Sequence, residues 1–77
     1  METDWEPEPS DIEWTRQNIA PLKNNGIWMI PASGTIFQFD KAHKRVYLSG
    51  NQVAEVALRA KKVLMLLGYT VIERKAA

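Results

Sequence analysis

Apolar residues recur at spacings of three and four between positions 53 and 67, which is the period of one face of an α-helix. The stripe consists of Val53, Val56, Ala57, Ala60, Val63, Leu64 and Leu67. We expect this helix to begin near Asn51 and to end at Gly68, since glycine favours the left-handed conformation of a C-terminal cap. An amphipathic helix must bury its stripe against another layer, so the remainder of the chain has to supply that layer.

Three short runs rich in β-branched and aromatic residues precede this helix and predict strands. They cover residues 27–30, 35–39 and 45–48, and the connections at 31–34 and 40–44 have hairpin length. In the second and third runs, large apolar residues alternate with other residues, which is typical of strands that bury one face. We therefore expect a three-stranded antiparallel meander.

A further helix is predicted before the strands. Ser10 and Glu13 have the spacing of a capping box, in which each side chain bonds the other residue's backbone amide. The residues that share its apolar side are Ile12, Thr15, Ile19 and Leu22. Pro21 lacks an amide donor, so the regular helix should stop near Ala20.

Residues 69–72 alternate again and predict a fourth strand, which gives the order αβββαβ. The expected fold is therefore a two-layer α+β domain, in which an antiparallel sheet of three to four strands packs against two helices. This domain spans residues 10–74. We expect residues 1–9, where acids alternate with prolines, to form a disordered acidic arm, and residues 75–77 to be frayed.

Composition narrows the class of protein. The chain has 77 residues, no cysteine and one histidine, so it has room for one domain, cannot form disulfides and lacks the ligands of a structural zinc site. Its longest purely apolar run, Val63–Leu67, is far below the ~20 residues that a bilayer span requires. We expect a cytoplasmic protein with no membrane association and no cofactor.

No combination of residues predicts catalysis. His43 lies in a predicted turn among basic residues, where a solvated side chain is the expected state. Ser33 and Ser49 lie in turns without a second histidine or a nucleophile elbow. The glycines are scattered singly and form no phosphate-binding loop. The sequence therefore predicts no enzyme, no metal site and no small-molecule ligand.

Charge is distributed unevenly along the chain. The first thirteen residues hold six of the nine acids, and all ten Lys and Arg residues follow them, so a net charge of +1 conceals a basic body. One basic cluster occupies the turn, with Lys41, His43, Lys44 and Arg45, and another occupies the second helix, with Arg59, Lys61 and Lys62. We favour an ordinary solvated surface for both, and contact with nucleic acid is the alternative.

The second helix also carries apolar residues outside its core stripe, notably Leu58, Met65 and Leu66. Either the helix lies between two layers or these residues contact another subunit. A homodimer and a monomer fit the sequence equally well.

Two resemblances bear on this prediction. The αβββα order resembles the double-stranded-RNA-binding domain in topology, but the start of the last helix, at residues 51–55, lacks the lysines with which that family binds phosphates. Residues 10–34, with SDIEWTR at 10–16, Leu22 and Lys23, Gly26 and Trp28, and Pro31, Ser33 and Gly34, resemble a family of small bacterial and prophage-type proteins that has no assigned activity. That resemblance implies a microbial or mobile-element setting and no functional residue.

The sequence thus predicts a small, non-enzymatic protein-interaction module that binds itself or another protein. Nucleic-acid binding through the basic turn and the second helix is the alternative.

Overall fold

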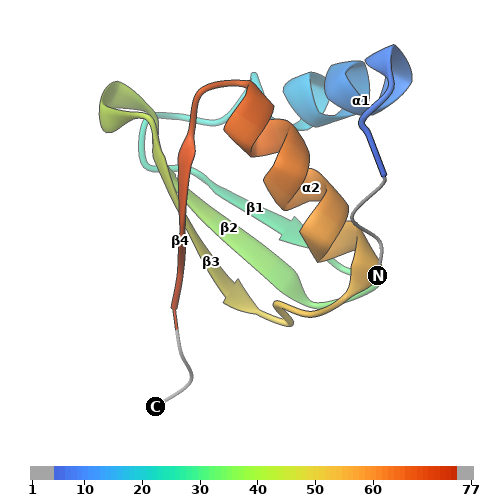
Figure 1. Cartoon of the computed structure of the whole chain (residues 1–77). Coiled ribbons are helices and arrows are strands. Elements are labelled where there is room, and N and C mark those ends of the chain that lie inside the picture. Colours follow the sequence, from blue (N-terminus) through green and yellow to red (C-terminus); the bar gives the residue numbers. More distant parts are fainter. Residues whose placement is uncertain (1–4, 75–77) are drawn as a thin grey trace.

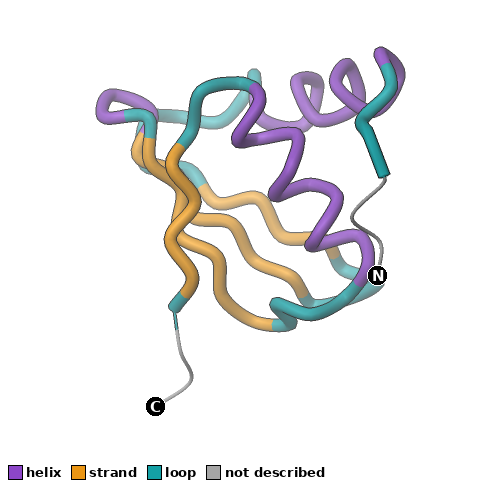
Figure 2. Tube along the Cα trace, in the orientation of Figure 1, coloured by secondary structure: helices purple, strands orange, loops and turns teal. Residues whose placement is uncertain are grey.

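The computed structural model describes residues 5–74 as a two-layer α+β fold (Figure 1). Its elements are α1 (Pro9–Ile19), β1 (Ile27–Ile30), β2 (Thr35–Asp40), the 3-10 turn η1 (Lys41–His43), β3 (Arg45–Gly50), α2 (Glu55–Leu66) and β4 (Thr70–Glu73). The strands form one sheet in the spatial order β1-β2-β3-β4. Both helices lie on the same side of this sheet, with α2 running across it and α1 beside α2 (Figure 2). The expected order and the α+β class are confirmed.

The sheet is mixed. Strands β1, β2 and β3 form the expected antiparallel meander, in which Phe37 pairs with Trp28 on one side and with Leu48 on the other. Strand β4 instead runs parallel to β3, with Val46 opposite Val71. A parallel neighbour needs a crossover connection, and α2 supplies it between β3 and β4. The antiparallel arrangement therefore holds for three strands, and β4 is the exception.

The core lies between the helices and the inner face of the sheet. Phe37, Phe39, Val46 and Leu48 point from β2 and β3 toward the helices and are at most 1% exposed. The residues of α2 that are buried above them are Ala57, Ala60, Val63 and Leu64, all from the predicted stripe. Aromatic contacts extend the core toward α1, because Trp28 stacks on Phe37 at 5.3 Å and meets Trp14 edge-on at 5.4 Å between ring centroids.

Helix α1 begins earlier than the capping signature suggested. Its N-cap is Glu8, Pro9 opens the first turn, and the reciprocal capping bonds join Glu8 and Asp11, including a 2.9 Å bond from the Glu8 amide to the Asp11 carboxylate. The predicted Ser10–Glu13 box is therefore wrong. Proline suits the first turn because its missing amide would have had no intrahelical partner.

Helix α2 begins later than expected. The side-chain carbonyl of Asn51 accepts the amides of Val53 and Ala54, both at 3.2 Å, and this turn delays the helix until Glu55. Side-chain bonds of this kind offer the backbone an alternative to helix. Val53 consequently lies outside the helix and is 82% exposed, although the sequence pattern placed it in the buried stripe.

Candidate interaction groove on the second helix

The segment before α1 lies against α2. The ammonium of Lys62 donates a 2.7 Å hydrogen bond to the Trp5 carbonyl, and the same ammonium lies 5.9 Å from the centroid of the Trp5 ring. The Arg59 guanidinium lies 5.2 Å from that centroid. Both distances are within the range of attraction between a cation and an aromatic face. Trp5, assigned by its sequence context to the disordered arm, is thus held by two cations of α2, whereas residues 1–4 of the predicted arm lie outside the described residues.

Two hollows adjoin the Trp5 side chain. The first, of about 290 Å³, lies between α1 and α2 and is lined by residues that include Trp14, Thr15 and Val56. The second, of about 340 Å³, opens on the outer side of α2. We call the second hollow the α2 groove, and it is lined by Trp5, Leu58, Arg59, Lys61, Lys62 and Met65, with Glu55 as a further lining residue. Trp5 and Arg59 line both hollows, so Trp5 forms part of the wall of each.

The α2 groove combines apolar and cationic lining. Leu58 and Met65 are 40% and 56% exposed, so they present apolar surface to solvent next to the cations. From the sequence, these two residues are candidates for self-association, and the cations are expected to form a solvated surface, with nucleic-acid contact as the alternative. The structure brings the two sets together in one groove. Leu66, the third predicted contact residue, is exposed but does not line the groove.

The three cations of the groove differ in how their charges are balanced. Arg59 pairs with Glu55 one helical turn away at 2.6 Å, and Lys61 pairs with Glu73 of β4. Within residues 5–74, Lys62 has no carboxylate partner, and its one hydrogen bond goes to a neutral carbonyl. Among residues 5–74, Lys62 is therefore the groove cation whose charge is least compensated.

The basic turn is largely engaged in local structure. Lys41 donates a 2.8 Å bond to the Leu22 carbonyl after α1, and the ammonium of Lys44 lies 4.7 Å from the Tyr69 ring centroid. His43 Nδ1 lies 2.9 Å from the Asp40 carboxylate. Of these four residues, Arg45 is the one whose side chain makes no hydrogen bond, ion pair or cation–π contact among the described residues. Three of the four side chains of the basic turn thus make contacts within the protein.

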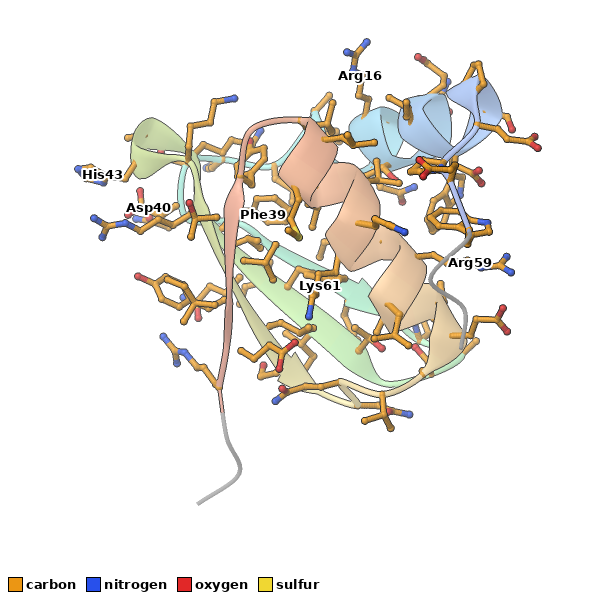
Figure 3. The ribbon with its side chains drawn as sticks, viewed as in Figure 1. Arg16, Phe39, Asp40, His43, Arg59 and Lys61 are labelled. Atoms are coloured by element: carbon orange, nitrogen blue, oxygen red, sulfur yellow. The ribbon has the colours of Figure 1, made fainter. Side chains whose placement is uncertain are left out.

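The two predicted basic clusters do not form one surface. In Figure 3, His43 and Arg59 lie on opposite sides of the molecule. A single stretch of nucleic acid backbone would have to span the whole domain to contact both clusters.

Chemical function at these positions is limited by the groups that are present. Among residues 5–74, no cluster of three or more His, Asp or Glu side chains is placed to hold a metal ion. The helices of the same part of the chain are too short and too polar to cross a membrane. The α2 groove offers apolar and charged groups for contact with another molecule.

No protein-family model, curated protein or solved structure matches the chain.

Trp5 is a residue of the candidate groove that was not predicted from the sequence. Segments of acids and prolines stay disordered because they have little apolar surface to bury. A large aromatic side chain within such a segment, as at Trp5, therefore indicates a contact with the folded domain. Two basic residues three positions apart on the second helix supply the complementary signal, because Arg59 and Lys62 would lie on one side of it. These two features indicate the residues on each side of the contact, but not that they meet.

Proposed function

We propose that this protein is a non-enzymatic protein-interaction module, and that its α2 groove binds an acidic segment of a partner protein that also carries apolar side chains. The observation that carries the proposal is the meeting of Leu58 and Met65 with three cations around one exposed groove. Aromatic and aliphatic anchors surrounded by a charged rim are characteristic of protein-interaction surfaces.

The positive charge of the α2 groove favours a negatively charged partner segment. Lys62 has no compensating carboxylate within the described residues, and Arg59 and Lys61 each retain exposure beside a single carboxylate. A carboxylate brought to Lys62 would gain an ion pair, whereas a cation brought there would meet repulsion from all three side chains. The apolar side chains of the same segment would cover Leu58 and Met65.

The alternative is nucleic-acid binding at the same groove. It is favoured by one observation, the Trp5 ring with two adjacent cations, because single strands bind to aromatic faces for stacking and to cations for their phosphates. The two cations approach the ring itself, however, and so compete with a base for the aromatic surface.

A titration followed by amide chemical shifts separates these functions. The probes are a short synthetic peptide in which glutamates alternate with leucine and phenylalanine, the same peptide with lysine in place of glutamate, and oligothymidylate at two salt concentrations. Saturable shifts at Leu58, Lys62 and Met65 with the acidic peptide alone support the proposal. Shifts with oligothymidylate that weaken steeply with salt support the alternative. If the acidic and basic peptides produce equal shifts, the groove does not select by charge and the proposal is wrong.

A further inference from the structure

The outer face of the sheet, which the helices do not cover, exposes several apolar side chains to solvent. Ile27 and Met29 of β1 are 56% and 55% exposed, and Ile72 of β4 is 37% exposed. Ile36 and Tyr47, on β2 and β3, lie between them in the register and are half-buried. The exposed Gln38 separates Ile27 from Tyr47 in their cross-strand row, and the Arg74 guanidinium lies 4.7 Å from the centroid of the Tyr47 ring. We call this surface, made of Ile27, Met29, Ile36, Tyr47 and Ile72, the open sheet face.

Such a composition is unusual for an uncovered sheet. Antiparallel strands with one face in water normally alternate apolar and polar residues, and β1, with the sequence IWMI, does not alternate at all. Both helices lie on the opposite side (Figure 1). Exposed apolar side chains grouped on one face of a small protein mark a place of contact. Ile27, Met29 and Ile72 are the part of the open sheet face that such a contact would cover.

Two charged residues at one end of the open sheet face indicate which molecule would bind it. Asp40 at the end of β2 is opposite Arg45 at the start of β3, and strand alternation directs both side chains to the outer face. No ion pair joins these two side chains in the described structure, since Asp40 bonds His43 and Arg45 stays exposed. A negative and a positive group thus occupy matching positions on the two central strands.

We propose that the open sheet face packs against the same face of a second copy, related by a two-fold axis that runs parallel to the strands between β2 and β3. This rotation places β2 over β3 of the second copy and β1 over its β4. Asp40 then faces Arg45 of the second copy, and the pair occurs twice. Ile27 likewise faces Ile72 of the second copy, because both occupy the same cross-strand row as Gln38 and Tyr47.

The arrangement makes the face self-complementary. The apolar side chains of the outer strands are removed from water, and the two ion pairs close one end of the interface and fix the register. Sheets that pack face to face keep their strands within about 30° of each other, which the rotation about a strand-parallel axis allows. The α2 groove lies on the opposite layer and stays accessible, so this inference is independent of the proposed function.

Sedimentation velocity over a range of concentrations tests the dimer. We expect the mass to rise from monomer to dimer, and Ile27→Lys to raise the dimer Kd at least about tenfold, since each copy would bring a lysine onto apolar surface. Leu66→Lys on α2 and Val53→Lys before it are matched controls and should leave the Kd unchanged. A constant monomer mass up to about 1 mM would overturn the proposal. It would be overturned equally by a dimer that Leu66→Lys weakens and Ile27→Lys does not.

Mixing two charge-reversal variants tests the axis. Asp40→Arg and Arg45→Asp should each raise the dimer Kd at least about tenfold, because like charges would face each other across the interface. An equimolar mixture should form a heterodimer with a Kd near that of the wild type, since opposite charges then face each other between copies although residues 40 and 45 carry like charges within each chain. Circular dichroism confirms that each variant is folded. If the mixture associates no better than the single variants, the proposed two-fold arrangement is wrong.

Discussion

Replacing Trp5 by alanine should destabilise the folded protein by about 1–2 kcal/mol. The ring is attracted to two cations, Arg59 at 5.2 Å and Lys62 at 5.9 Å, and each such contact at a partly exposed site contributes about 0.5–1 kcal/mol. The hydrogen bond from Lys62 to the residue 5 carbonyl survives the substitution, because it uses the backbone. For a domain of this size, each kcal/mol lowers the midpoint of thermal unfolding by about 4–8 °C.

Urea denaturation is the suitable assay for this variant, because urea is uncharged and does not screen the cations as guanidinium would. A double-mutant cycle with Arg59→Met isolates one contact, and a coupling free energy of about 0.5–1 kcal/mol is expected. Val53→Ala, which removes an exposed apolar side chain with no such contacts, is the control. The reasoning is refuted if Trp5→Ala stays within about 0.3 kcal/mol of the wild type or if the cycle shows no coupling.

Two further stability predictions concern positions outside the groove. Lys41→Met keeps the aliphatic stem but removes the charged donor to the carbonyls after α1, so urea denaturation should show a loss of about 1–2 kcal/mol, against less than about 0.5 for Lys23→Met on the surface. If both changes are neutral, Lys41 is not a structural residue. Gly50→Ala and Gly34→Ala both force a side chain into left-handed backbone, at φ 69° and 75°. A methyl group at Gly50 would also lie 2.2 Å from the Gly34 carbonyl oxygen, so Gly50→Ala should be the more destabilising by at least about 2 kcal/mol in thermal unfolding. Equal losses would contradict this account of the turn.

Periodicity was sufficient to predict the elements and their order. The spacing of Ala57, Ala60, Val63 and Leu64 identifies α2 because core burial enforces it, and the runs at 27–30 and 45–48 identify strands for the same reason. The ends of the helices were harder to predict, since they depend on which of several polar side chains accepts a hydrogen bond from a backbone amide. The capping bonds between Glu8 and Asp11 fix the start of α1, and the Asn51 side chain binds the amides of the residues before α2.

The candidate site required contacts that local patterns do not contain. Hydrophobic period placed Leu58 and Met65 outside the core, and charge spacing placed Arg59 and Lys62 on one side of the helix. Neither pattern could join them to Trp5, because the contact spans more than fifty positions of chain. The parallel direction of β4 was within reach of the sequence, since a helix between two neighbouring strands makes a crossover. The apolar outer face of β1 was equally visible as a strand without alternation.

Affinity for the acidic amphipathic peptide, measured by isothermal titration calorimetry on the wild type and two charge variants, tests most directly whether the α2 groove is the binding surface. Lys62→Glu and Lys23→Glu change the net charge equally, but only Lys62 lines the groove. We expect saturable binding to the wild type, a Kd at least about tenfold higher for Lys62→Glu, and a Kd within about twofold of the wild type for Lys23→Glu. Equal weakening in both variants would show that the peptide responds to net charge alone, and that result, like the absence of binding to the wild type, would contradict the groove as the interaction site.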